Sequence, residues 1–431
     1  MLPQQESVDF VPALEALSGR IRENSSKLSW YVQSQDHLDA SLYGSGTIPK
    51  SPRHRDAQGW RHRLKQDALD LFRLASGPEE YIANLSINHQ YTTCLRWLCR
   101  FRIFELIPHE GSVSYNNISI VAGVSESHLK SVCRMAMTTG LFCEPEPNRV
   151  AHTATSLLLA TNQDFAAWAK CVSEYMYASS SHLAQASEKS FRSGRPEHSA
   201  YSAAYGTDTT FPDALRQNPK LARDFGGFLR ATQSIYANDV QHVLDGFDWG
   251  SLKHAKVVDV GPSSARMSTQ LSEVFEFLEI VVHTQPRSSS QIRTELEAAP
   301  SDVASRIAVE VNEGPLLKFG GAADVFVLRH MLHHFPEEIA VALLGNLVSC
   351  LNPGGAILIA DLVLPQPGAM GSHDEGMIRA RDLIHKELSN GETRYREDWE
   401  RLVQKVGNRL SIAKVTTPIG SDLSLLELRV V

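Results

Sequence analysis

The 431-residue sequence has no excess of positive charge and no grouped cysteines. It holds 42 Lys and Arg residues against 49 Asp and Glu residues, which gives a net charge of −7. Proteins that bind nucleic acid present a basic surface to the phosphates, so this balance argues against nucleic acid as the main partner. The six cysteines lack Cys-x-x-Cys spacing and predict neither a metal site nor a disulfide framework.

Long apolar runs, an N-terminal signal region and internal repeats are also lacking. These absences predict a cytoplasmic protein without a membrane partner. The apolar share of 42% and the charged share of 21% are those of an ordinary globular protein. The length is sufficient for two or three domains, each with its own core.

The first part of the chain is predicted to be helical. Residues 1–85 are polar with weak helical periodicity, so we expect two or three helices joined by a mobile loop at 47–56. Residues 92–108 predict one amphipathic helix.

Residues 112–153 have the pattern of a winged helix. Two helices are expected on either side of a turn at Gly123, the second with Ser125 as its N-cap, and two short strands follow. The apolar face of the second helix is expected to hold Leu129, Val132, Cys133 and Met137. Because that helix offers only Lys130 and Arg134 as basic groups, a scaffold or dimerisation role is favoured over DNA binding.

Residues 163–245 are expected to form helices with many aromatic side chains. Such side chains usually form core, but two segments packed beside a cleft also line an apolar pocket. The candidate pocket residues in this region are Phe165, Trp168, Tyr175, Met176 and Phe228.

Strands and helices alternate from residue 255 onward, which predicts a doubly wound α/β domain. The candidate strands are 256–260, 279–283, 306–311, 324–328, 356–361, 410–415 and 425–430. The two clearest helices are expected to bury Leu271, Val274, Phe275 and Leu278 in the first, and Leu343, Leu344, Leu347 and Leu351 in the second. Ligands of such folds bind where the parallel strands end, so the residues just after each strand are the ones to inspect.

Several segments together resemble plant- and fungal-type small-molecule O-methyltransferases from about residue 90 onward. They include "VAHTATS", "GFDWGSL", "ADVFVLRHMLHHFPEE", "LNPGGAILIADLVLP" and "NGETRYREDW". The resemblance implies a helical winged-helix dimerisation domain at 1–160, a helical linker lining the substrate pocket at 161–245, and a seven-stranded, Rossmann-like class I methyltransferase-like domain at 246–431. It also implies a homodimer.

The turn that holds S-adenosylmethionine in this family is altered. The family pattern is Asp-x-Gly-Gly-Gly/Ser-x-Gly, and this chain keeps Asp259 and Gly261 but has Pro262 and Ala265 in place of two glycines. Proline removes an N–H and fixes φ, and alanine resists the positive φ that glycine tolerates.

A second part of the implied donor site has changed as well. Thr284 stands where the family has an Asp that binds the ribose hydroxyls, and the acidic residue near the adenine corresponds to Asn312 or Glu313. A threonine hydroxyl cannot replace a charge-assisted pair of hydrogen bonds. Two changes in one pocket predict a chain without a bound cofactor, with drift at a surface loop as the alternative.

The family's catalytic base is a His in a His-Asp-Trp string, which corresponds to residues 333–335. The resemblance therefore implies His333 as the base and Asp361 as the acid that orients it. A second family acid corresponds to Thr393, with Glu392 adjacent. The alternative is that His333 has only a structural role, with its ring nitrogens hydrogen-bonded at a strand-to-helix turn.

Three functions compete on these residues. They are an S-adenosylmethionine-dependent O-methyltransferase of a small phenolic or pyridone metabolite, a non-catalytic methyltransferase-like subunit, and an enzyme that reuses the pocket without a methyl donor. We favour the third, because the sequence is similar to fungal O-methyltransferase-like pericyclases. That resemblance implies dehydration of a polyketide-derived pyridone alcohol to a quinone methide, followed by Alder-ene or hetero-Diels–Alder cyclisation.

A pericyclase needs a shaped apolar pocket and a few proton-handling groups. Met331 would complete the apolar wall. The polar candidates are His333, Thr232, Asp361 and His152. Thr232 is equally explained as a mid-helix Thr that bonds its own backbone, and His152 as a fold marker at the end of the wing.

Overall fold

The chain is described from a computed structural model over residues 10–34, 55–190, 195–312, 321–335, 337–391, 393–407 and 410–430. Its contacts divide it into two units. The helical unit comprises Met1–Ser234 and Leu383–Gly391, and the sheet unit comprises Ile235–Asp382 and Glu392–Val431. No helix within these described ranges is long and apolar enough to cross a membrane.

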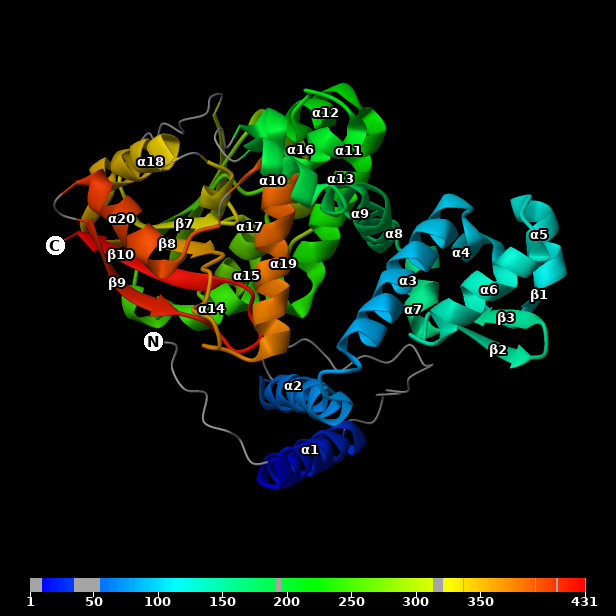
Figure 1. Cartoon of the computed structure of the whole chain (residues 1–431). Coiled ribbons are helices and arrows are strands. Elements are labelled where there is room, and N and C mark those ends of the chain that lie inside the picture. Colours follow the sequence, from blue (N-terminus) through cyan, green and yellow to red (C-terminus); the bar gives the residue numbers. More distant parts are fainter. Residues whose placement is uncertain are drawn as a thin grey trace. The chain divides into compact units, whose positions relative to one another are not determined.

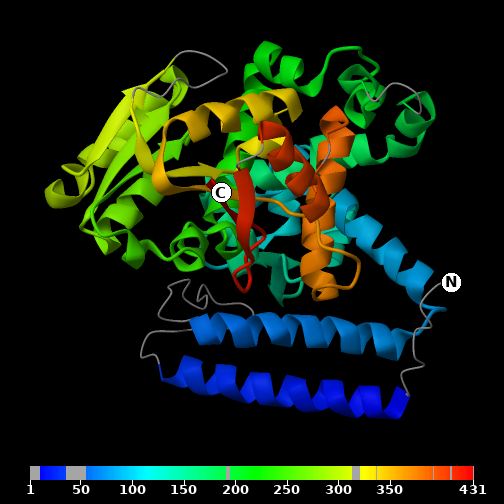
Figure 2. The same ribbon diagram turned by 90° about the vertical axis from the view of Figure 1, so that its left-hand side faces the viewer.

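The helical unit begins with two long helices, α1 (Phe10–Gln33) and α2 (Arg55–Ser76), which run side by side (Figures 1 and 2). The Arg20 guanidinium donates to the Asp67 carboxylate at 2.8 Å and joins them. The mobile loop predicted at 47–56 lies, up to residue 54, outside the described residues.

The single helix predicted at 92–108 is interrupted, and this prediction was wrong. α3 (Tyr81–Arg100) ends before Arg102, which has a φ of 54°, and the short α4 (Ile103–Leu106) follows. A left-handed residue cannot continue a right-handed helix, so the chain changes direction there.

The winged helix is confirmed. α5 (Tyr115–Ala122) and α6 (Glu126–Met137) flank Gly123, whose φ is 66°, and the β2 (Phe142–Glu146) and β3 (Arg149–His152) hairpin follows. A third strand, β1 (Val113–Ser114), pairs with β3. Ser125 stands at the N-cap position of α6, but its side chain makes no capping hydrogen bond, whereas Ser114 caps α5.

From Ala154 to Ser234 the helical unit continues with further helices, most of them short. They are α7 (Ala154–Thr161), α8 (Gln163–Lys170), the π-helix η2 (Cys171–Met176), α9 (Tyr177–Ser180), α10 (Leu183–Ser190), the 3₁₀ turn η3 (Pro196–His198), α11 (Ala200–Tyr205), α12 (Phe211–Gln217) and α13 (Pro219–Ser234). Gly227 allows α13 to approach α8 closely, because a Cβ at this position would lie 2.6 Å from the Cβ of Ala167.

The sheet unit contains all seven predicted strands, in the order β6-β5-β4-β7-β8-β10-β9. Their bounds are β4 Ala255–Val260, β5 Leu278–Thr284, β6 Ile307–Val311, β7 Ala323–Arg329, β8 Leu351–Asp361, β9 Leu410–Thr416 and β10 Ser424–Val430. The first five in this order pair in parallel, and β10 is antiparallel to both neighbours. The predicted α/β fold is therefore confirmed as a mixed sheet.

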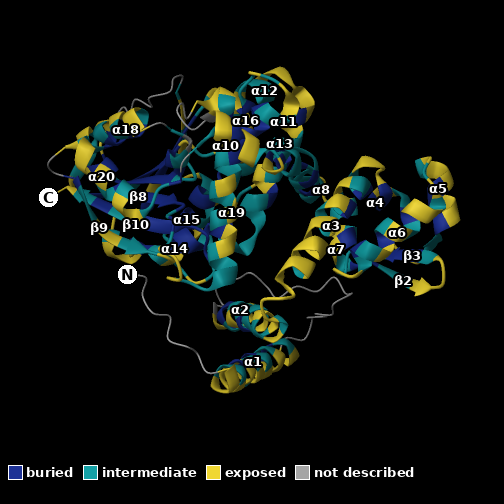
Figure 3. Cartoon of the chain, viewed as in Figure 1, coloured by how far each residue is buried: buried dark blue, intermediate teal, exposed yellow. Residues whose placement is uncertain are grey.

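Helices cover both faces of the sheet, whose strands form the buried centre of this unit (Figures 1 and 3). One layer contains α14 (Gln241–Gly246), α15 (Arg266–Val274), α16 (Pro286–Glu297) and α17 (Ser301–Ala304), and the other contains α18 (Glu337–Ser349) and α20 (Arg396–Val406). The 3₁₀ turns η4 (Tyr236–Asn238), η5 (Trp249–Leu252) and η6 (Leu332–His334) connect elements, and α19 (Ser372–Ser389) begins in the sheet unit and ends in the helical unit.

Three of the apolar positions predicted for these helices are misplaced. Val274 is 60% exposed at the end of α15, Leu278 begins β5 and Leu351 begins β8. The apolar pattern runs on from helix into strand, so periodicity alone did not mark the boundary.

Candidate functional site

His333 and Asp361 lie together at the ends of two neighbouring parallel strands, β7 and β8. His333 is in η6, which follows β7, and Asp361 is the last residue of β8. Nδ1 of His333 and Oδ1 of Asp361 are 2.7 Å apart, and the backbone N–H of His333 donates to Oδ2 at 3.2 Å. The structure thus brings together the two residues that the resemblance implied as base and orienting acid.

Charge and burial fix the state of this pair. Asp361 is fully buried, which by itself raises its pKa, but the charge and hydrogen bond of His333 outweigh burial and lower the pKa to about 2. An ionised carboxylate can only accept, so Nδ1 of His333 carries the hydrogen. In the neutral imidazole Nε2 is therefore the ring nitrogen with the lone pair, which is the arrangement a general base requires.

Arg394 supports the turn that carries His333. Its guanidinium donates to the carbonyl oxygens of Leu332 at 3.0 Å and Phe335 at 3.1 Å, on either side of the base. Sequence reasoning missed this residue, although it lies within the quoted "NGETRYREDW" segment. Thr393 is buried and its backbone N–H donates to Asp382, while Glu392 lies outside the described residues.

His330 has an unusual conformation three residues before the base. Its φ is 52°, and its ring centroid is 6.2 Å from that of His333. Burial and the neighbouring Arg329 charge hold the pKa of His330 well below its usual range. Its Nε2 is buried without a hydrogen-bond partner among the described residues. Strained residues and unsatisfied polar atoms are concentrated at functional sites.

The turn after β4 is closely covered by its own chain. Gly261 has a φ of 70°, and its N–H donates to the carbonyl of His283 at 2.7 Å. A Cβ at Gly261 would lie 3.0 Å from the methyl carbon and 3.2 Å from the sulfur of Met331. The structure therefore places Met331, one of the predicted pocket residues, directly against this glycine.

Two side chains from other elements, those of Thr284 and Glu295, make hydrogen bonds to this turn. The Thr284 hydroxyl, fully buried at the end of β5, donates to the carbonyl of Pro262 at 2.9 Å. The Glu295 carboxylate of α16 accepts from the Ala265 N–H at 2.6 Å and from the Ser264 hydroxyl at 2.8 Å. Glu295 was missed in the sequence, because no local pattern links it to a turn thirty residues earlier.

Asp259 is buried beneath the turn. Burial raises its pKa to about 7, against the opposing effects of the Ser268 hydroxyl and the Arg329 charge. Arg329 is held in place by donating to the carbonyl of Asn238. Asn312 donates its N–H to the carbonyl of Thr284 at 3.0 Å, and Glu313 lies outside the described residues.

A network of charged side chains also lies at this edge of the sheet unit. Arg266 donates to Asp239 at 3.0 Å, and Arg381 binds Asp422 at 2.7 Å and the side-chain oxygen of Asn238 at 3.0 Å. The contacts join the segment before β4 to the first residue of α15 and, through Arg381 of α19, to the loop before β10. Sequence reasoning missed these long-range pairs.

Three predicted pocket residues form an aromatic cluster in the helical unit. The rings of Phe165 and Trp168 on α8 are 5.9 Å apart, and Trp168 meets Phe228 of α13 edge-on at 6.2 Å. Tyr175 and Met176 belong to the π-helix η2, a form often found at functional sites. The Tyr175 hydroxyl donates to Asp224 at 3.2 Å.

The remaining polar candidates make internal hydrogen bonds. The Thr232 hydroxyl donates to the carbonyl of Leu229 at 2.9 Å, the backbone bond that the alternative interpretation expects. The His152 ring contacts the hydroxyl of Ser156 at 2.9 Å and the carbonyl of Ile107 at 3.3 Å, and burial lowers its pKa. Both residues belong to the helical unit, and their catalytic roles stay predictions.

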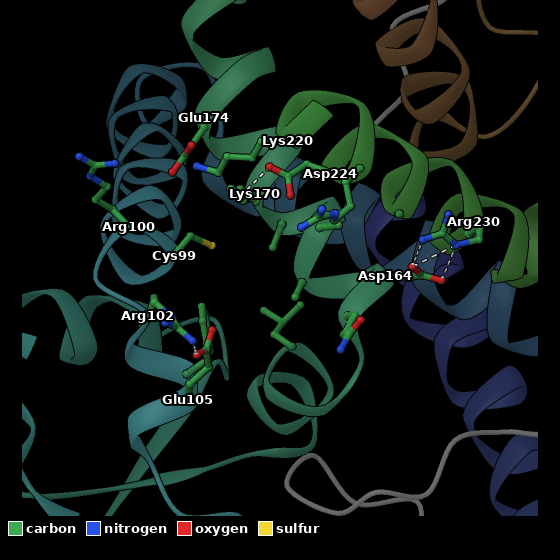
Figure 4. A pocket seen from close by; sticks show the side chains of 18 residues that line it. Cys99, Arg100, Arg102, Glu105, Asp164, Lys170, Glu174, Lys220, Asp224 and Arg230 are labelled. Atoms are coloured by element: carbon green, nitrogen blue, oxygen red, sulfur yellow. Dashed lines mark hydrogen bonds and ion pairs between the residues drawn. The ribbon is translucent and has the colours of Figure 1, made fainter. Parts of the chain in front are cut away.

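A cavity of about 480 Å³ also lies in the helical unit (Figure 4). Ion pairs stand on its wall: Lys170 with Asp224 at 2.5 Å, Arg230 with Asp164 at 2.7 Å, and Arg102 with Glu105. Its lining contains none of the predicted pocket aromatics. The cavity thus carries many charged side chains beside apolar ones and is not the pocket of aromatic residues that the sequence predicts. Among the described residues, no group of His, Cys, Asp and Glu is placed to hold a metal ion.

Comparison with known proteins gives the family. Residues 182–409 match the family described as "O-methyltransferase domain". The chain is 37% identical to "O-methyltransferase aoiF" of Aspergillus oryzae over 86% of this chain and 89% of that protein. It is 32% identical to "O-methyltransferase pgmB" of Aspergillus terreus over 100% of this chain and 99% of that protein. The solved structure "A Pericyclic Reaction enzyme" is similar in fold, with a TM-score of 0.71 and 15% identity over 96% of this chain and 100% of that one. The chain therefore belongs to the fungal O-methyltransferase family.

Proposed function

We propose that this chain is an enzyme of fungal secondary metabolism in which His333 removes a proton from a hydroxyl group of a small-molecule substrate. The observation that carries the proposal is the 2.7 Å pair of His333 and buried Asp361 where β7 and β8 end. Asp361 holds the imidazole so that Nε2 accepts the proton, and its charge stabilises the imidazolium that results. Arg394 keeps the turn under the base in place.

The first candidate for the fate of the deprotonated oxygen is methylation. It is favoured by the relatives, because proteins named O-methyltransferases match nearly the whole chain. The acceptor would be a phenol- or pyridone-type hydroxyl, whose anion is a far better nucleophile than the neutral group. The donor would be S-adenosylmethionine, which supplies the methyl group when bound.

The second candidate is a reaction that needs no donor. It is favoured by the turn after β4, where Pro262, Ala265 and Thr284 replace the residues that would contact the donor. In a pericyclase of this kind His333 would take the proton of the pyridone hydroxyl and return it to the alcohol oxygen as the C–O bond breaks, so that water leaves and a quinone methide remains. The quinone methide then closes a ring. The homodimer implied by the resemblance applies to either candidate.

The test is product formation by the purified chain. A phenol, a naphthol and a 2-pyridone alcohol are each incubated with and without S-adenosylmethionine and analysed by mass spectrometry. A gain of CH₂ identifies methylation, and loss of water or an isomeric ring-closed product identifies the donor-free reaction. His333→Ala should lower the rate of formation of either product by a factor of about 10²–10⁴, the usual contribution of a general base. Full activity of His333→Ala would overturn the proposal.

A further inference from the structure

We propose that the turn at 261–265 has a structural role, and that the chain does not bind the methyl donor of its relatives. Hydrogen bonds from Thr284 and Glu295 hold this turn in a conformation that leaves no donor site, and we call the turn so held the closed joint. The inference deepens the proposed function and rests on it for the reaction at His333. It assigns to that site a donor-free reaction. The residues that would hold S-adenosylmethionine do not fit this group, for four reasons.

The first reason is the supply of backbone donors. A nucleotide-type ligand at a strand-to-helix turn is held by N–H groups that point at it. Pro262 has no N–H, and those of Gly261, Ala265 and Arg266 donate to His283, Glu295 and Ser264 within the unit. Four of the six positions from 261 to 266 therefore offer no N–H to a ligand.

The second reason is the Thr284–Pro262 hydrogen bond. The buried Thr284 hydroxyl donates to the carbonyl of Pro262 at 2.9 Å. An ionised Asp at the same position could not make this bond, because a carboxylate and a carbonyl oxygen are both acceptors. The bond is made to a backbone carbonyl, so it depends on the hydroxyl of Thr284 and turns that side chain toward the turn and away from a ligand.

The third reason is Glu295, whose carboxylate is bonded at the N-terminus of α15. An anionic group is favoured there by the helix dipole and the N–H groups of the first turn. In this chain the anion is a side chain of α16, and it bonds both Ala265 and Ser264.

The fourth reason is Met331. A glycine at the end of the first strand normally leaves room for a ligand to approach the backbone. At Gly261 the methyl and sulfur of Met331 lie 3.0 and 3.2 Å from the position of a Cβ. The flexible end of the Met331 side chain therefore lies over this glycine, and a ligand that approaches the backbone there must displace it.

The experiment is calorimetric titration of the full-length chain with S-adenosylhomocysteine, the donor's stable product. We expect no saturable binding. Saturable binding with a Kd in the micromolar range overturns the inference by itself, whatever the variants do.

A variant tests which residues are responsible. The triple change Pro262→Gly, Ala265→Gly and Thr284→Asp restores the family pattern and should give saturable binding where the wild-type chain shows none. The matched control is Thr294→Asp, which makes the same chemical change on the exposed side of α16 and should leave binding unchanged. A folded triple variant that binds no better than the wild-type chain would overturn the assignment to these residues, and the thermal transition of each variant shows whether it is folded.

The two proposals fail separately. Micromolar binding of S-adenosylhomocysteine, with product still dependent on His333, would remove the closed joint and leave the base in place. Product formation unaffected by His333→Ala would remove the base and leave the binding result as it stands.

Discussion

Replacement of Asp361 by Asn tests the electrostatics of the site most severely. The side chain is fully buried and accepts hydrogen bonds from the Nδ1 and the backbone N–H of His333 and from the N–H of Leu362 at 2.8 Å. Asn has the same shape but no charge, and its NH₂ group is a donor. If it faces His333, Nδ1 must become the acceptor, and the hydrogen moves to Nε2.

The expected size of the effect follows from the shifted pKa. The pKa of Asp361 is 3.8 in the unfolded chain and about 2 in the folded one, so the ionised carboxylate stabilises the native state by about 2 kcal/mol. Because the folded-state pKa is the lower one, this stabilisation is present above pH 4 and is lost as the pH falls from about 4 to 2. Asp361→Asn should therefore be less stable at neutral pH and lack this part of the acid dependence.

The assay has two readouts. Urea unfolding at pH 7 and at pH 3 should show a destabilisation by about 2 kcal/mol that becomes smaller at the lower pH. Product formation should fall by on the order of 10²–10⁴, because the base is left in the wrong tautomer. A variant with unchanged rate and unchanged acid dependence would refute this account of the pair.

Two further predictions use matched neighbours in the helical unit. Gly227→Ala should lower the free energy of unfolding by about 1–2 kcal/mol, because its new Cβ would lie 2.6 Å from that of Ala167. The new Cβ of Gly226→Ala would meet only the flexible Arg230 side chain, so this variant should raise the free energy of unfolding by up to about 1 kcal/mol. Thermal unfolding should move in opposite directions for the two, and a shift of the same sign would contradict the packing argument. Ser114→Ala should cost about 1 kcal/mol by removing a cap, and Ser125→Ala should cost almost nothing since its side chain caps no N–H. Equal urea midpoints for these two would contradict the capping assignment.

The sheet was predictable because its signal is local. Most of the seven strands are short apolar runs between polar segments. Six were found within one residue of their observed bounds, and β8 begins at Leu351, five residues before its predicted start. The break at Arg102 was not predictable, because no glycine or proline marks this left-handed residue and the apolar pattern continues on both sides of it. The same holds for Leu278 and Leu351, whose apolar character suits either a helix face or a strand.

The site was predictable where a residue stands at a strand end. His333 and Asp361 follow adjacent parallel strands, so the fold rule and the family string both bring them together. Glu295 and Arg394 could not be found in this way, since each acts on a distant segment through two long-range hydrogen bonds. The hydrogen bond from the Thr284 hydroxyl to the Pro262 carbonyl could not be predicted either, although Thr284 itself had been identified as an altered position.

Chemical rescue of His333→Ala tests the central claim most directly. The variant leaves a space where the imidazole stood, and free imidazole in solution can supply the missing base. The measurement is the rate of product formation by the variant as imidazole is added, on the substrate identified in the product screen. The account predicts almost no product without imidazole and a rate that rises with its concentration, and no such rise in Asp361→Asn. A His333→Ala variant that is as active as the wild-type chain, with no response to imidazole, would contradict it.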